Sequence, residues 1–125
     1  MLYMGVDVVT IQNIFGENLG LSPYLINIIK IGNLGHLLRI SGGEENGWFN
    51  GLLELGETTS LAIEAIEARG HGLDFITSLE AAAIQCGAEE MLIIGALSAA
   101  EPFWEKAGYS PTPELLPVTH KKILI

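Results

Sequence analysis

The stretch Arg69-Gly70-His71-Gly72 divides two segments of different hydrophobic pattern near the middle of the chain. Before it, residues 59–66 alternate in part between apolar and polar side chains, which predicts a strand, although Ala, Glu and Ile also suit a helix. After it, apolar residues recur at helical spacing over residues 73–86, and Gly87 stands where a left-handed helix cap belongs. A strand, a glycine turn and a helix start in this order present unpaired backbone N–H groups at the positive end of the helix dipole, an arrangement that suits phosphate.

The residues after this helix predict a crossover connection. Residues 91–94 are wholly apolar, as expected of a short strand covered on both faces. A strand, a helix and a second strand form a βαβ unit, which implies parallel pairing and a right-handed connection. A short helix is expected from Ser98 or Glu101 to Ala107, and residues 118–125 predict a last strand.

The first half of the chain predicts two helices and a hairpin. A short helix is expected over residues 8–15, and a second one from Ser22-Pro23 to Gly32, because Ser suits the N-cap and Pro the first turn. Residues 37–40 and 48–55 read as the two strands of a hairpin, separated by a turn-like composition. We expect the helices to pack on one face of the sheet.

Length and composition favour one folded domain. The 125 residues fit a single core, and with 49% hydrophobic against 17% charged residues the chain is not of the disordered class. Six Lys and Arg against fifteen Asp and Glu give a formal net charge of −9, so binding to nucleic-acid phosphates is not expected. An acidic surface suits a cationic acceptor such as an amine, although acidity also simply supports solubility.

Cysteine usage and hydropathy predict a cytoplasmic protein without a membrane partner. Cys86 is the single cysteine, so no internal disulfide can form. No stretch approaches the roughly 20 continuous apolar residues of a membrane span, and residues 1–4 lack the basic region of a secretion signal.

A second motif lies one strand beyond the glycine turn, Glu101-Pro102-Phe103-Trp104-Glu105-Lys106-Ala107-Gly108-Tyr109. The two motifs, in this order and at this separation, resemble those of the GNAT superfamily of acetyl-coenzyme A dependent N-acetyltransferases. The family's turn reads Arg or Gln, two residues, Gly, one residue, then Gly or Ala. Residues 69–73 match its first five positions, whereas Asp74 departs from the sixth. A carboxylate there can bond the N–H groups that a pyrophosphate would occupy, so we expect weakened coenzyme affinity.

The resemblance implies an α/β (α+β) fold in a single domain of residues 1–125, with residues 1–35 as a variable helical region. Its sheet is expected to be mixed and mostly antiparallel, with a central parallel βαβ crossover and flanking helices. The pantetheine arm of acetyl-coenzyme A is expected between residues 61–66 and 91–94, where the parallel strands splay apart. The cofactor-binding residues implied by the resemblance are Ile63, Ala65, Ile66, Arg69, Gly70, His71, Gly72, Leu73, Asp74, Ser98, Phe103 and Trp104.

The implied reaction is direct transfer of acetyl from acetyl-coenzyme A to an amine, without a covalent enzyme intermediate. The family habit of a strand-end carboxylate base favours Glu64 or Glu67, although each also fits a solvated surface charge. In many members a Tyr protonates the departing thiolate, and Trp104 occupies its place here with an indole N–H that is no usable acid. Water, another side chain or Tyr109 would then supply the proton, although Tyr109 also fits a place in the core.

Two other functions fit the same residues. Asp74 and Trp104 together suggest a degenerate relative that binds without catalysis, and the glycine turn also suits a nucleotide-binding module unrelated to acyl transfer. His36 and His120 show no spacing typical of a metal site, so no metal is expected. The expected partner is a small-molecule or protein amine, and an exposed Trp48 or Trp104 would indicate a homodimer interface.

Overall fold

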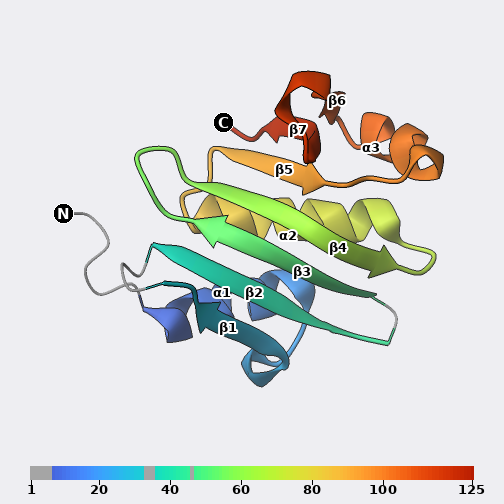
Figure 1. Ribbon diagram of the computed structural model, residues 1–125. Helices are drawn as coiled ribbons and strands as arrows, with labels where there is room; N and C mark the ends of the chain where they lie inside the picture. The colour runs from blue at the N-terminus through green and yellow to red at the C-terminus, as the bar shows by residue number, and fades with distance from the viewer. Residues whose placement is uncertain (1–6, 33–35, 46) are drawn as a thin grey trace.

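The computed structural model describes residues 7–32, 36–45 and 47–125 of the chain (Figure 1). The expectation for residues 1–4 lies outside the described residues, as do residues 33–35 of the expected helical region and Asn46 of the expected hairpin turn. Within these ranges the chain forms a mixed α/β fold around a 7-stranded, mostly antiparallel sheet with the strand order β1-β2-β3-β4-β5-β7-β6. In chain order the elements are α1 (Val8–Leu19), the short 3-10 turn η1 (Pro23–Leu25), β1 (Ile26–Lys30), β2 (Leu37–Glu44), β3 (Gly47–Glu54), β4 (Ser60–Ala68), α2 (Gly72–Gln85), β5 (Glu90–Ile94), the turn η2 (Ser98–Ala100), α3 (Glu101–Lys106), β6 (Ser110–Pro111), the turn η3 (Pro113–Leu115) and β7 (Val118–Ile123).

The predicted crossover at the centre of the sheet is confirmed. β4 is a strand rather than the competing helix, and it leads through a turn at Gly70 into α2. β5 then pairs with β4 in parallel, from Ser60 opposite Glu90 to Ile63 opposite Ile93. Gly87 has a φ of 91°, the left-handed conformation expected where α2 ends.

The predicted helix over residues 22–32 is wrong. Ser22 and Pro23 begin only the turn η1, and Ile26–Lys30 then forms β1, an edge strand antiparallel to β2. The residues of β1 form their backbone hydrogen bonds with β2 instead of within a helix. The β-branched Ile residues of this segment also suit the surface of a sheet. Ile26 is fully buried by this pairing, so tertiary burial decided against the local helix signal.

One face of the sheet carries the core under α1 and α2, which lie side by side behind the strands in Figure 1. Alternate residues of β3 point to this face, and Phe49 and Leu53 are fully buried there. Phe15 of α1 stacks on Phe49 with ring centroids 5.8 Å apart. The alternate residues Trp48 and Glu54 point to the opposite face, called here the open face, on which neither α1 nor α2 lies.

Two irregularities flank the end of the parallel β4–β5 ladder. Against β3, Ile63 lies opposite Gly51 and Ala65 opposite Asn50, so Glu64 is an extra residue in β4. Against β5, the register of β7 shifts in the same way at Thr119. An extra residue bends its strand and increases the local twist. β4 and β7 are therefore both distorted where the parallel ladder ends.

Gly51 is required by the close approach of β3 and β4 at this bulge. A Cβ atom added to Gly51 would lie 2.7 Å from the Ala62 carbonyl oxygen, a backbone atom that cannot move aside alone. We predict that Gly51→Ala lowers the free energy of unfolding by about 1–3 kcal/mol, measured by urea denaturation.

The matched control is Gly56→Ala, because a Cβ atom at Gly56 would meet its nearest neighbour at an ordinary 3.6 Å. Its unfolding free energy is expected to stay within about 0.5 kcal/mol of the parent value. Equal stability of the two variants would show that the bulge does not depend on the missing side chain.

Candidate functional site

A cleft opens where β4 and β5 separate. Their ladder ends at Ile63 and Ile93, yet β4 continues to Ala68. Among the described residues, the end of β4 from Glu64 onward pairs only with β3, so the backbone groups of its other edge face the gap. The cleft has a volume of about 440 Å³. It is lined by Trp48, Ile63, Glu64, Ala65, Ile66, Ala68, Gly72, Ile76, Ile93, Ile94, Gly95, Ala96, Leu97, Ala100, Phe103 and Trp104.

The cleft wall is apolar apart from one carboxylate. Glu64 is the charged residue among the lining side chains, and most others are aliphatic or aromatic. The lining comes from both sides of the sheet: Gly72 and Ile76 belong to α2, whereas Trp48 points to the open face. A concave apolar site with few polar groups, of this size, is typical of small-molecule binding.

Thr119 holds the end of β5 in position. Its hydroxyl accepts a hydrogen bond from the Ala96 backbone N–H at 3.0 Å and donates to the Ile93 carbonyl at 3.2 Å. The same oxygen lies 3.1 Å from His120 Nδ1, which is the donor because the hydroxyl proton already goes to Ile93. One side chain therefore replaces the backbone pairing that the bulge removes.

The first turn of α2 lies beside the cleft. Gly70 has a φ of 76°, and His71 caps the helix without a side-chain hydrogen bond. The ring Nδ1 of His71 instead donates to the Arg69 carbonyl at 2.7 Å. A Cβ atom at Gly72 would lie 2.8 Å from the Phe103 ring, so the absence of a side chain lets that ring rest on the turn. The N–H groups of this turn have no side-chain cap.

The structure brings together half of the predicted cofactor-binding residues. Four others do not line the cleft but lie next to lining residues or within the adjoining turn, namely Arg69, Gly70, Leu73 and Ser98. The predicted residues that line it are Ile63, Ala65, Ile66, Gly72, Phe103 and Trp104.

His71 and Asp74 lie on the other side of the first turn of α2. They line a second hollow of about 510 Å³, together with Glu44 and Glu45 at the end of the β2–β3 hairpin. Asp74 does not cap the turn, so the expected competition between its carboxylate and a bound pyrophosphate is not seen.

The two predicted base candidates have different surroundings. Glu64 lines the cleft and accepts a hydrogen bond from Arg39 Nη1 at its Oε1 atom. Glu67 does not line the cleft; it accepts a hydrogen bond from Trp48 Nε1 at 3.3 Å and pairs with Arg69 at 3.4 Å. Only Glu64 is placed to meet a molecule in the cleft.

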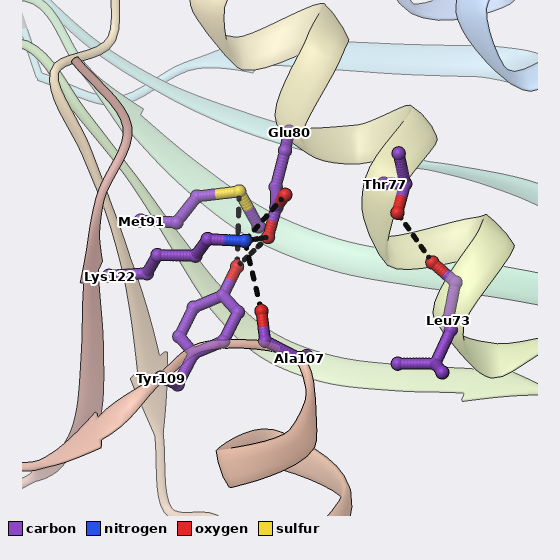
Figure 2. A network of polar contacts seen from close by, with 7 residues as sticks. All are labelled: Leu73, Thr77, Glu80, Met91, Ala107, Tyr109 and Lys122. Carbon is purple, nitrogen blue, oxygen red and sulfur yellow. Dashed lines mark hydrogen bonds and ion pairs between the residues drawn. The ribbon is translucent and has the colours of Figure 1, made fainter.

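Tyr109 is buried in the core and does not line the cleft. Figure 2 shows the polar network around its hydroxyl. Its hydroxyl donates to Glu80 Oε2 at 2.9 Å, and Lys122 Nζ contacts both Glu80 oxygens and the Ala107 carbonyl at 2.9–3.1 Å. Burial, followed by the Glu80 charge and hydrogen bond, raises the pKa of the Tyr109 phenol. These contacts agree with the core alternative for Tyr109 and not with a proton donor to the departing thiolate: the network attaches α3 and β7 to α2.

Trp104 is buried beside Tyr109 and forms part of the cleft wall. Its ring meets those of Phe103 at 4.9 Å and of Tyr109 at 5.3 Å, both edge to face. Trp104 is 4% exposed, whereas Trp48 is 40% exposed and lines the cleft. A dimer interface at Trp48 stays a prediction.

Several residues of this site escaped the sequence reasoning. Arg39 lies 25 residues before its partner Glu64, and Thr119 acts 23 residues after Ala96. The Oδ1 atom of Asn50, beside the bulge, is buried without a hydrogen-bond partner. No local pattern marks these residues, because each depends on strands that become neighbours only in the folded sheet.

Comparison with known proteins adds no evidence on the function of this site. No protein-family model, curated protein or solved structure matches this chain. Among the described residues, no three His, Cys, Asp or Glu side chains gather as metal ligands. None of the helices in the described ranges has the length and apolar character needed to span a membrane.

The raised pKa of Tyr109 predicts how stability changes with alkaline pH. The folded state binds this proton more tightly than the unfolded state, whose phenol has a pKa of about 10. The stabilisation is complete below that pH and is lost as the pH rises above it. We therefore expect Tyr109→Phe to cost about 1 kcal/mol near neutral pH, through the lost hydrogen bond, but to flatten the fall in stability above about pH 10.

Urea denaturation over a series of pH values measures this difference. Tyr24→Phe is the control, because Tyr24 is 80% exposed and its removal leaves the alkaline fall unchanged. Cys86, whose pKa burial raises to about 11, is present in both variants, so its contribution cancels. An alkaline limb equally steep in both variants would contradict the assignment to Tyr109.

Proposed function

We propose that this protein is a GNAT-type N-acetyltransferase that moves an acetyl group from acetyl-coenzyme A to an amine. The observation that carries the proposal is the apolar cleft at the end of the parallel β4–β5 ladder, beside the uncapped first turn of α2. A thioester on a long amide-containing arm needs a strand edge to bind the arm and an anion site for its phosphates. The cleft and the turn supply both features in contact with each other.

The edge of β4 is the proposed partner of the pantetheine arm. Strand residues alternate their backbone N–H and C=O groups between two neighbours, and residues 64–68 have lost the neighbour on the cleft side. The two amides of the arm can take the place of the missing strand. Ile66, Ile94 and Phe103 would cover its apolar portions.

The first turn of α2 is the proposed site of the pyrophosphate. Its N–H groups carry the positive end of the helix dipole and have no side-chain cap. Arg69 is 65% exposed, and its ion pair with Glu67 at 3.4 Å is a surface contact worth at most about 1 kcal/mol. A phosphate can therefore compete for this guanidinium at little cost.

Glu64 is the proposed general base. The neutral amine nitrogen attacks the thioester carbonyl, the C–S bond breaks, and the nitrogen gives up a proton that the Glu64 carboxylate accepts directly or through water. Arg39 holds Oε1 of that carboxylate and orients it. The departing thiolate takes its proton from water, because Trp104 offers no acid and the Tyr109 hydroxyl is bound to Glu80 outside the cleft.

A binding protein without catalysis is the second candidate. It is favoured by the aromatic cluster of Phe103, Trp104 and Tyr109, which fills with packed rings the place where the family's acid stands. In this alternative the cleft binds the coenzyme but no transfer follows. A nucleotide-binding module would instead bind adenosine phosphates as well as it binds coenzyme A.

Thermal unfolding with acetyl-coenzyme A tests the cleft. Ligand at about 100 times its Kd stabilises the native state by about 2.7 kcal/mol, which raises Tm by roughly 10 °C. We expect Ala100→Phe, which fills the cleft, to weaken binding at least about tenfold. Ala99→Phe is the matched control, because this neighbouring side chain is exposed and outside the cleft.

The outcomes separate the candidates. Stabilisation lost in Ala100→Phe and kept in Ala99→Phe supports coenzyme binding in the cleft. Equal stabilisation by adenosine diphosphate favours the nucleotide module. No shift with millimolar acetyl-coenzyme A contradicts both the transferase and the coenzyme-binding alternative.

Glu64 and Glu67 provide a matched pair for the chemistry. We predict that Glu64→Gln lowers kcat by about 100-fold or more with little change in coenzyme affinity, as expected for loss of a general base. Glu67→Gln, outside the cleft, is expected to keep kcat within about twofold of the parent. Steady-state release of coenzyme A with an amine acceptor measures both, and equal losses would remove Glu64 from the role of base.

A further inference from the structure

Two large apolar side chains are exposed at the rim of the cleft. Trp48 of β3 is 40% exposed and Leu97, just after β5, is 76% exposed, and both line the cleft. Trp48 lies on β3, on the far side of β4 from the gap, and Leu97 lies in the segment that follows β5, so the two residues come from opposite sides of the gap between β4 and β5. Exposed apolar side chains that gather around an opening are typical of a groove that binds an apolar ligand.

The carboxylate of Glu64 adds a polar point inside this apolar rim. Arg39 Nη1 occupies Oε1, and no described residue hydrogen-bonds Oε2. Arg39 belongs to the open face, because its neighbours Leu38 and Ile40 are fully buried against the helices. The ion pair therefore draws Glu64 toward the open face, on the side where Trp48 stands.

The two ends of the cleft differ in chemistry. Gly72 and Ile76 bring the first turn of α2, with its uncapped N–H groups, to the helix-covered side. Trp48 and Glu64 bring an aromatic ring and a carboxylate to the open face. An anion is favoured at the first end and a cation at the second. One molecule carrying both a negative and a positive charge is not required. An anionic ligand can enter from the helix-covered side of the sheet and a cationic ligand from the open face.

The charge at the open face is nearly balanced. Arg39 offsets Glu64, and Arg69 offsets Glu67 in the neighbouring ion pair. A polycation or a basic peptide would meet both guanidinium groups here. A small molecule with one ammonium group and an apolar body matches this end of the cleft better than a polycation does, because the ammonium group can pair with Glu64 Oε2 while the body contacts the apolar rim.

We infer that the open-face end of the cleft binds the acceptor, a small primary amine with an apolar and preferably aromatic body. Its ammonium group contacts Glu64 Oε2, and its body lies between Trp48 and Leu97. This inference rests on the proposed function for the reaction, but the amine site is defined by its own residues. The ammonium group releases one proton to water, the neutral nitrogen then faces the carbonyl of a thioester held against the edge of β4, and Glu64 accepts the second proton as the amide forms.

Calorimetric titration with two probe amines, carried out with and without millimolar coenzyme A, tests this site. Phenethylamine is expected to bind at least about tenfold more tightly than ethylamine, because only its ring reaches Trp48 and Leu97. Trp48→Ala and Leu97→Ala should each reduce this preference severalfold. Leu116→Ala is the control, because Leu116 is 71% exposed, close to the 76% of Leu97, and lies outside the cleft.

Trp48→Phe separates the ring from its hydrogen bond to Glu67, and the preference is expected to survive in it. A thermal shift with acetyl-coenzyme A is recorded for every variant. Coenzyme binding with equal affinity for both amines, or a preference unchanged in Leu97→Ala and Trp48→Ala, overturns the amine site and leaves the proposed function standing. No coenzyme shift together with the ring preference supports the amine site and overturns the transferase. Absence of both overturns both.

Discussion

The end of the parallel ladder at Ile63 and Ile93 is the constraint on which the site depends. β4 gains an extra residue at Glu64 and β7 gains one at Thr119, and both distortions lie where β4 and β5 stop pairing. Each backbone group freed in this way needs a partner, because buried unpaired groups are costly. Thr119 satisfies the β5 side, whereas the β4 edge is left facing the cleft. The backbone groups of this edge are therefore the ones to which the proposed ligand can hydrogen-bond.

The wall of the cleft is held by a polar network that lies outside it. The Glu80 carboxylate of α2 accepts hydrogen bonds from Lys122 of β7 and from the Tyr109 hydroxyl. Lys122 also donates to the carbonyl of Ala107, the C-cap residue of α3. This attachment positions α3, whose Trp104 forms the wall. The same contacts engage the Tyr109 hydroxyl in a hydrogen bond that helps to pack the end of α3 against α2.

The cleft is better equipped for binding than for acid–base chemistry. Its surfaces are apolar, and Glu64 is its one lining carboxylate. Direct transfer from a thioester asks little more of a protein than orientation and a base, since thiolate is a good leaving group that water can protonate. The sparse chemistry of the wall is thus compatible with the proposed transfer. The aromatic packing at Trp104 is what keeps a binding-only protein in consideration.

Local sequence determined the elements whose signals lie within a few residues: the strand, glycine turn and helix around Gly70, the β2–β3 hairpin, and the left-handed end of α2 at Gly87. Periodicity and glycine conformation act at that range. Half of the cofactor-binding residues implied by the resemblance line the cleft, since they belong to the strand before the glycine turn, to the turn itself and to the second motif. Only the tertiary structure turned Ile26–Lys30 into a strand, paired Arg39 with Glu64 and moved Tyr109 into the core. Those outcomes depend on burial and hydrogen bonds between segments far apart in the chain, which no local pattern contains.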